Sequence, residues 1–302
     1  MNNQNNTQPL VSVIMNCYNG EKFLHESIKS VLSQTYQHWE LIFWDNKSED
    51  GSAKIFKSYS DKRFKYHLAS EHTLLSEARN EAVKRSSGEF IAFLDTDDFW
   101  ERDKLKLQIP LFKDPEVGVV YGNLFIVNEK SNMKKIFLKG KKPRGFILGD
   151  LLKNYCTLLA TLVIRKSFLD NYQPAFNSSY HIAGDFDLMI RMSAKYKFEC
   201  VEKPIASWRS HWKNESFLKK NSQIQELKIW REKMKDYTSI FNNKNFLKID
   251  EKIITLEVVS LILDNDRKGA RLQLKRMPFS LRKVKYLISL LLPNNFVRKF
   301  IF

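Results

Sequence analysis

The residues best suited to chemistry follow a short hydrophobic run. Residues 90–94 end in three carboxylates within four positions, Asp95, Asp97 and Asp98. A run without alternation predicts a strand buried on both faces, and ligands of open α/β sheets bind at the carboxyl ends of strands. Crowded carboxylates repel one another, and oxygen ligands suit Mg²⁺ or Mn²⁺. The pattern indicates a metal site, with an acidic turn that caps the next helix as the alternative.

Two other expected strand ends carry polar or aromatic residues. Tyr18 and Asn19 follow the strand 11–15, and an aromatic ring there could stack on a nucleobase or simply pack. Asp45 follows the strand 41–44 and could accept hydrogen bonds from a base or ribose. Three later residues of that loop are more typical of turns and helix caps: Ser48, Asp50 and Ser52. Taken one at a time, each of these features is a weak signal.

The elements that must position these residues alternate along the first hundred positions. Hydrophobic spacing predicts strands at 11–15, 41–44, 64–68 and 90–94 and helices at 21–33, 53–59 and 76–85. Repeated βα units imply a parallel sheet with right-handed crossovers. Farther along we expect a strand pair at 117–121 and 124–127, a basic loop at 134–144, a strand at 159–164 and helices from 166 and over 185–196.

The composition of the 302 residues narrows the class of protein. Three widely spaced cysteines support neither a disulfide framework nor a zinc knuckle, so a reducing cytoplasm is expected. The polar N-terminus lacks the features of a secretion signal, and no apolar run approaches the roughly 20 residues of a spanning helix. The net charge is +16, and residues 267–302 hold ten Lys or Arg without any Asp or Glu. This asymmetry suggests an anionic partner, which would be a nucleic acid or a membrane surface. The alternative is a basic face that is merely solvated.

The last third of the chain has a helical pattern. Lysine-rich helices are expected over 217–237 and 249–263, and two shorter ones over 267–292, where Pro278 breaks the pattern. The segment 281–302 spaces apolar residues as a helix does, between cations. Such a basic amphipathic helix can lie in a membrane interface, and the alternative is a helix that covers the rest of the protein.

The order of the motifs resembles glycosyltransferase family 2. The matching segments are VSVIMNCYNG at 11–20, SVLSQTY at 30–36, LIFWDNKSEDGS at 41–52, ARN at 78–80 and GEFIAFLDTDD at 88–98. The resemblance implies the GT-A fold, an α/β, Rossmann-like mixed sheet flanked by helices. It further implies a disordered segment at 1–9, a catalytic domain at 10–216 and a basic helical region at 217–302.

By the same resemblance, Asp95-Thr96-Asp97 is the family's DxD motif. Asp97 would ligate the metal, and Asp95 would contact the nucleotide sugar. Tyr18, Asn19 and Asp45 fall where the family holds the donor nucleotide and its base, and Arg79 falls where a cation approaches the nucleotide. Asp98 receives no firm role.

Two later segments also resemble family motifs. The segment GDFDL at 184–188 places Asp185 at the position of the catalytic base, although acids here also favour a helix N-terminus. The segment WRSH at 208–211 makes His211 a candidate for contacting the metal or diphosphate, with a surface loop histidine as the alternative. Three positions depart from the family pattern: Asn16 replaces a proline, Asn46 an aspartate and Gly184 an acid.

The implied activity is inverting, Mn²⁺- or Mg²⁺-assisted transfer of a sugar from a nucleotide diphosphate donor to a glycan or lipid-linked acceptor. The expected location is the cytoplasm or the inner face of the cell membrane, with residues 267–302 as a peripheral membrane contact. One alternative is a phosphatase or nucleotidyl-processing enzyme, but the order Asp-Thr-Asp-Asp-Phe after Leu94 is not that of haloacid-dehalogenase phosphatases. Another is a non-enzymatic basic binding protein. A nucleic-acid partner is not expected, because the tail's aromatic residues cluster at its end and do not interleave with its cations.

Overall fold

The computed structural model describes residues 8–211, 214–292 and 296–297. The chain divides into two compact units. The first comprises residues 1–151 and 155–212, and the second comprises residues 152–154 and 213–302. The segment 1–9, for which disorder was predicted, lies almost wholly outside the described residues.

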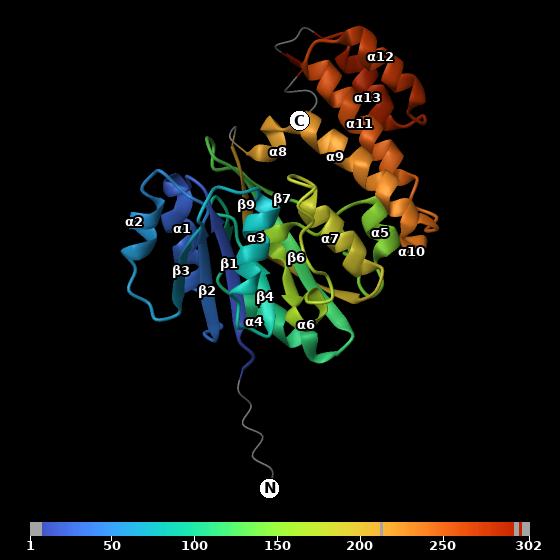
Figure 1. The fold of residues 1–302 in the computed structure, drawn as a ribbon. Coiled ribbons are helices and arrows are strands. Elements are labelled where there is room, and N and C mark those ends of the chain that lie inside the picture. The colour runs from blue at the N-terminus through green and yellow to red at the C-terminus, as the bar shows by residue number, and fades with distance from the viewer. Residues whose placement is uncertain (1–7, 212–213, 293–295, 298–302) are drawn as a thin grey trace. The chain divides into compact units, whose positions relative to one another are not determined.

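The alternating elements predicted for the first hundred residues are confirmed (Figure 1). The strands are β1 (Val11–Cys17), β2 (Trp39–Asp45), β3 (Phe64–Leu68) and β4 (Phe90–Phe93). The helices between them are α1 (Glu21–Leu32), α2 (Ser52–Lys57) and α3 (Leu75–Lys84). Their bounds differ from the predicted ones by two residues at most, because hydrophobic periodicity fixes the type of an element better than its ends.

Within the described residues, nine strands form one mixed sheet in the order β3-β2-β1-β4-β8-β6-β9-β5, and β7 pairs with β6. The additional strands are β5 (Phe99–Trp100), β6 (Val117–Asn128), β7 (Lys134–Ile136), β8 (Val163–Arg165) and β9 (Lys197–Ser210). The four strands from β3 to β4 run parallel, whereas β8 is antiparallel to both β4 and β6. The α/β mixed sheet expected from the sequence is therefore confirmed.

Three expectations for the middle of the chain are wrong. The strand pair at 117–121 and 124–127 is a single strand, β6, whose register with β9 shifts around Gly122 and Asn123. The expected loop 134–144 begins with strand β7. The expected strand 159–164 is mostly the 3₁₀ turn η2 (Leu159–Thr161), and β8 begins only after it. Apolar residues alone did not distinguish a bulged strand, a strand pair and a buried turn.

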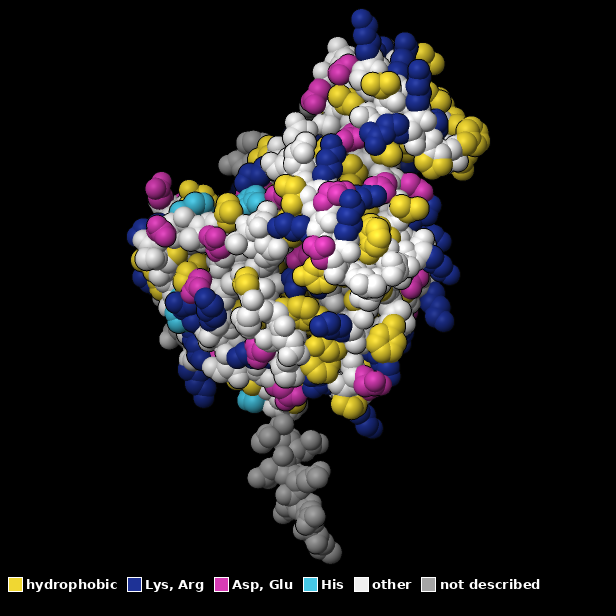
Figure 2. Space-filling view, turned by 45° about the vertical axis from the view of Figure 1, so that its right-hand side comes forward, with side chains coloured by type: hydrophobic (Ala, Val, Ile, Leu, Met, Phe, Trp, Pro, Cys, Tyr) yellow, Lys and Arg dark blue, Asp and Glu magenta, His cyan; other side chains and the backbone are white. Residues whose placement is uncertain are grey.

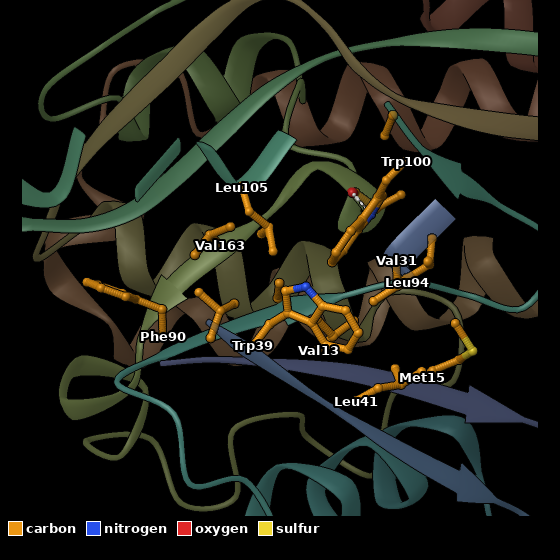
Figure 3. Close-up of a cluster of buried hydrophobic side chains, with 14 of the residues drawn as sticks. Val13, Met15, Val31, Trp39, Leu41, Phe90, Leu94, Trp100, Leu105 and Val163 are labelled. Atoms are coloured by element: carbon orange, nitrogen blue, oxygen red, sulfur yellow. Dashed lines mark hydrogen bonds between the residues drawn. The ribbon is translucent and has the colours of Figure 1, made fainter. Parts of the chain in front are cut away.

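The sheet buries side chains on both faces. Val13 and Met15 of β1 point to one face, where they belong to the main core together with Val31 of α1 (Figure 3). Successive strand residues alternate between faces, so Ile14 lies on the other one. Helix α3 packs on β1 and β2. The strands therefore stay rigid up to their carboxyl ends, where the candidate site residues begin.

Shorter helical elements complete the first unit: α4 (Lys104–Gln108), η1 (Ile109–Lys113), most of α5 (Leu148–Lys153), α6 (Lys166–Leu169) and α7 (Gly184–Ser193). The second unit is helical, with α8 (Glu215–Leu218), α9 (Lys220–Lys233), η3 (Met234–Asp236), α10 (Thr238–Phe241), α11 (Lys248–Leu263), α12 (Arg267–Arg276) and α13 (Leu281–Ser289). The helix expected over 217–237 is split into α8, α9 and η3. Among the described helices, none combines the length and apolar content needed to cross a membrane.

The pairing of β1 with β4 depends on Gly88. A Cβ atom on this residue would lie 2.6 Å from the Ser12 backbone nitrogen and 2.8 Å from the Leu10 carbonyl oxygen. The Gly88 amide donates to Ser12 Oγ at 2.8 Å. Replacing Gly88 with Ala should therefore push β4 away from β1 and lower the free energy of unfolding by roughly 1–3 kcal/mol in urea denaturation.

Ser87→Ala is the matched control for this prediction. The Ser87 side chain is exposed, and its backbone amide, which donates to Glu40 Oε1 at 2.7 Å, is unchanged by the substitution. Equal urea midpoints for Gly88→Ala and Ser87→Ala would contradict the close approach of the two strands.

Candidate functional site

The candidate site lies where the strand order reverses. The chain proceeds from β1 outward to β2 and β3, then returns to place β4 on the other side of β1. Loops that leave adjacent strands in opposite directions open a crevice at their carboxyl ends, and this is where open α/β sheets bind ligands. Tyr18 and Asn19 follow β1, and Asp95 and Asp97 follow β4, so the topology brings these predicted residues to one edge of the sheet.

The loops after β1 and β2 are joined at the start of helix α1. The first amides of a helix lack partners within it and must find acceptors elsewhere. Here the amides of Asn19, Gly20 and Glu21 donate to the next loop. The acceptors are Ser48 Oγ at 3.1 Å, Ser52 Oγ at 3.0 Å and Asp50 Oδ2 at 3.0 Å. The capping role predicted for these three residues is confirmed, and they serve α1 from a distant part of the sequence.

Asp45 is directed into the protein. Its side chain is 1% exposed, with Oδ1 accepting from the Ser48 amide at 2.8 Å and Oδ2 from Tyr66 Oη at 2.7 Å. Asn19 has φ of 52° and accepts the Glu49 amide through Oδ1 at 2.8 Å. Both residues thus fix the shape of the two loops. Their contact with a donor nucleotide stays a prediction.

Tyr18 offers an aromatic surface at the same edge. Its side chain is 50% exposed, and its ring lies 4.1 Å from that of His72, centroid to centroid. His72 is oriented by Asn46, whose carbonyl oxygen lies 3.0 Å from Nδ1. His72 was not predicted as a site residue, because nothing local in the loop after β3 distinguishes it from other polar residues.

Each carboxylate of the acidic loop after β4 has a different partner. Arg79 of α3, which is 6% exposed, donates through Nη2 to Asp95 Oδ1 at 3.0 Å. Asp97 Oδ2 lies 2.9 Å from His211 Nε2. The structure therefore pairs each DxD aspartate with another predicted site residue, Asp95 with Arg79 and Asp97 with His211.

Asp98 anchors this loop to β9. It is buried and accepts the Arg209 backbone amide through Oδ1 at 2.9 Å. Burial raises the pKa of Asp98 well above its usual range, and the nearby Asp97 and Asp95 carboxylates raise it further. No firm role was predicted for Asp98, and these contacts make it structural.

Two side chains from other elements hold the backbone of the acidic loop. Ser27 of α1 donates through Oγ to the carbonyl oxygens of Thr96, at 2.7 Å, and Asp98, at 2.5 Å. Arg209 donates through Nε to the Asp97 carbonyl oxygen at 3.0 Å and pairs with Glu26 of α1. The chain direction at the acidic residues is thus set by α1 and β9 together.

The two acids at the start of α7 differ in their surroundings. Asp187 is buried and forms an ion pair with Arg191 at 2.7 Å, so it stabilises the helix. Asp185 is only partly buried, and its Oδ1 accepts the Phe186 amide at 2.8 Å. Burial raises the pKa of Tyr155, with Asp185 adding to the shift and Arg79 opposing it.

Helix α3 connects the acidic loop to the loop that precedes α7. Next to Arg79, Asn80 donates through Nδ2 to the Phe176 carbonyl oxygen at 2.7 Å and accepts the Phe176 amide at 2.9 Å. Ser76 Oγ donates to the Tyr180 carbonyl oxygen at 2.5 Å. A Cβ atom on Gly184 would lie 2.8 Å from Ser76 Oγ. With Ser76 in this position, glycine fits at 184, where the family pattern has an acid.

The donor set at the acidic loop fits a divalent cation that is shared with a substrate. Asp97 offers a carboxylate that is 31% exposed, and His211 offers a ring nitrogen 2.9 Å from it. Among the described residues there is no group of three or more His, Cys, Asp or Glu side chains that could hold an ion by themselves. Mg²⁺ and related ions commonly bind through one or two carboxylates and take their other ligands from water and substrate phosphates. Asp97 and His211 would thus supply the protein's share of such a site.

Comparison with solved structures defines the class of fold. TarS 1–349 of S. aureus in complex with UDP-GlcNAc has a TM-score of 0.62 at 17% identity, covering 96% of this chain and 88% of that one. Mannosyltransferase PcManGT from Pyrobaculum calidifontis, in complex with GDP-Man and Mn²⁺, has a TM-score of 0.64 at 16% identity, covering 98% and 84%. The fold is that of the GT-A glycosyltransferases.

Sequence comparison then gives the family. The family model described as glycosyl transferase family 2 matches residues 12–170, and the chain belongs to this family. WfgD of Escherichia coli, a UDP-Glc:α-D-GlcNAc-diphosphoundecaprenol β-1,3-glucosyltransferase, is 38% identical over 168 residues, 55% of this chain and 64% of WfgD. TuaG of Bacillus subtilis (strain 168), a putative teichuronic acid biosynthesis glycosyltransferase, is 32% identical over 161 residues, 53% of this chain and 62% of TuaG. The chain thus spans less than two thirds of the length of both relatives.

The family resemblance and the GT-A fold expected from the sequence are confirmed.

The contact between Gly184 and Ser76 can be tested by a double-mutant cycle. Gly184→Ala alone should force Ser76 Oγ to rotate away from the Tyr180 carbonyl, at a cost of about 1 kcal/mol in the free energy of unfolding. In a Ser76→Ala background no hydroxyl is present, so the same change should be neutral or stabilising, because Ala favours helices. Urea denaturation of the four proteins gives the coupling free energy, and additive effects would contradict the contact.

Proposed function

We propose that the protein transfers a sugar from a nucleotide diphosphate donor to a glycan or lipid-linked acceptor, with inversion at the anomeric carbon and with Mn²⁺ or Mg²⁺. The main support is the pairing of Asp97 with His211 at the strand-order reversal, within a chain of family 2. The relative WfgD is named for a UDP-glucose donor and a diphosphoundecaprenol acceptor. UDP-glucose is therefore the first donor to test, and a polyprenol diphosphate sugar the first acceptor.

The acidic loop would bind the donor diphosphate. In the proposal, Asp97 and His211 hold the metal, which when bound neutralises negative charge on the departing diphosphate. Asp95 contacts the nucleotide sugar and is oriented by Arg79, whose guanidinium also balances the charge of the loop.

The nucleotide would lie over the loops after β1 and β2. Tyr18 is half-exposed and its ring contacts that of His72 at a tilt of 39°, so a nucleobase could stack on its exposed part. In the proposal, Asn19 and Asp45 have two roles. They hold these loops in a fixed shape, and they contact the nucleotide directly. Their hydrogen bonds to Glu49 and Ser48 support the first of these roles.

Asp185 is the proposed general base. Its carboxylate takes the proton of the acceptor hydroxyl as the hydroxyl oxygen forms a bond to the anomeric carbon. The bond from that carbon to the diphosphate oxygen breaks, and its electron pair leaves with the nucleoside diphosphate. A single displacement of this kind inverts the configuration. Asp185 is the partly exposed acid of α7, whereas Asp187 is engaged by Arg191, which supports this choice between the two.

The remaining parts of the proposal concern organisation and location. Residues 10–216 form the catalytic domain, and 217–302 form an accessory helical region that brings the enzyme to its acceptor. The protein works in the cytoplasm at the inner face of the membrane, where residues 267–302 make a peripheral contact, and it takes no nucleic-acid partner. The lipid-linked acceptor in the name of WfgD and the ten cations of this segment support that location.

The metal assignment predicts a specific loss of ligand binding in Asp97→Asn and His211→Ala. UDP with Mn²⁺ should raise the melting temperature of the unchanged protein, because a ligand that binds only the native state stabilises it. Both variants should lose the Mn²⁺-dependent part of this rise, and EDTA should have the same effect on the unchanged protein. Asp170→Asn, an exposed aspartate of the same unit, is the control. Full Mn²⁺-dependent stabilisation of Asp97→Asn would contradict the assignment of Asp97 as a metal ligand.

The base assignment predicts a loss of turnover without a loss of donor binding. Asp185→Asn should lower kcat by about 10²–10⁴, the usual contribution of a general base, because the amide cannot accept the proton. The melting-temperature rise with UDP and Mn²⁺ should stay unchanged, and Asp170→Asn should keep both properties. If Asp185→Asn retains its turnover, the base is another residue.

A further inference from the structure

Helix α13 turns an apolar stripe toward solvent. Leu281, Val284, Ile288 and Leu291 recur at i, i+3, i+7 and i+10, which places them along one side of a helix and its C-terminal turn. Leu281 is 90% exposed, Leu291 76% and Ile288 43%. Phe279, in the turn before the helix, is 88% exposed.

The other side of α13 already has its packing partners. Tyr286 and Leu290 are buried with Val258 of α11 and with Ala270 and Leu274 of α12. The apolar stripe is therefore additional to the residues that hold α13 in its unit. Contiguous apolar side chains on the surface of a protein mark an interaction site more often than chance exposure does.

Cations surround this stripe. By the helical period, Lys283 and Lys285 fall on its two sides, and Arg282 lies in the same turn. Residues 267–302 together carry ten Lys or Arg and no acid. Figure 2 shows hydrophobic and basic side chains exposed next to one another on this helical unit.

The combination of charge and shape selects one kind of partner. A second copy of the chain would bring two strongly cationic surfaces together, and like charges repel. A single-stranded nucleic acid would use aromatic rings on which bases stack, whereas this stripe is aliphatic apart from Phe279. An anionic bilayer satisfies both features, because its headgroups attract the cations and its acyl region accepts the apolar side chains.

We propose that α13 is a docking helix, with its apolar stripe and Phe279 inserted at the interface of an anionic membrane and its lysines in the headgroup layer. The docking helix gives the peripheral membrane contact of the proposed function a definite surface. Only the purpose of docking, to hold the enzyme beside a lipid-linked acceptor, rests on the proposed function. The surface itself is defined without reference to the catalytic residues.

Vesicle flotation of the whole protein tests this docking without acceptor or donor. The unchanged protein should bind vesicles of phosphatidylcholine with phosphatidylglycerol, bind pure phosphatidylcholine far less, and be released by high salt. Phe279→Ser combined with Leu281→Ser should lower the partition coefficient by about tenfold or more, because two large exposed side chains no longer insert. Leu218→Ser combined with Leu247→Ser is the matched control, since these leucines are 63% and 66% exposed in the same unit.

The stabilisation by UDP and Mn²⁺ is measured in the same proteins without vesicles, so failure of docking and failure of the catalytic proposal can be told apart. Loss of flotation only in the Phe279/Leu281 variant, with nucleotide stabilisation kept, supports the docking helix. Equal binding of the unchanged protein to neutral and anionic vesicles overturns it, as does flotation that the Phe279/Leu281 variant retains. Light scattering that shows a dimer dissociated by the same variant would also overturn it, because the partner of the stripe would be a second copy.

Discussion

The site is organised around the repulsion between three carboxylates at one strand end. Asp95, Asp97 and Asp98 emerge from β4 within four positions, and like charges so close cannot all stay ionised without compensation. The fold gives each a separate partner. Arg79 of α3 pairs with Asp95, His211 after β9 contacts Asp97, and the backbone of β9 binds the buried Asp98. Helix α3 and strand β9 must therefore be in place before the acidic loop can take its shape.

In the neighbouring loops, too, the residues available to a ligand are held in place by residues that are not. Asp45 and the serines of its loop use their oxygens on the backbone of the α1 N-terminus and of their own turn. These contacts restrict the loop that carries Tyr18, whose ring is half-exposed. A site built this way is preorganised, because supporting hydrogen bonds restrict the loops before any ligand arrives. Many of the polar residues in these loops thus serve to position a few exposed groups.

Prediction from the sequence succeeded where a pattern is local. The first four strands and three helices have regular hydrophobic periods, and the acids stand directly after one of those strands. It failed where an element depends on partners elsewhere. Strand β6 continues through Gly122 by pairing with β9, and Ile205 of β9 occupies the space where a side chain at Gly122 would be. Strand β9 was not predicted at all, since Pro204 and shifts in its pairing interrupt any simple alternation.

The sequence by itself determined the family, the position of the acids at the end of a strand, the helical character of the last third and the charge of the tail. Only the tertiary structure decided which partner each carboxylate takes, that Asp45 points inward and that the apolar stripe of α13 faces outward. The reason is physical. Periodicity and strand ends arise from neighbouring residues, whereas the contact between Asp97 and His211 joins positions more than a hundred residues apart. Such contacts depend on sheet register and helix packing, which the whole chain sets at once.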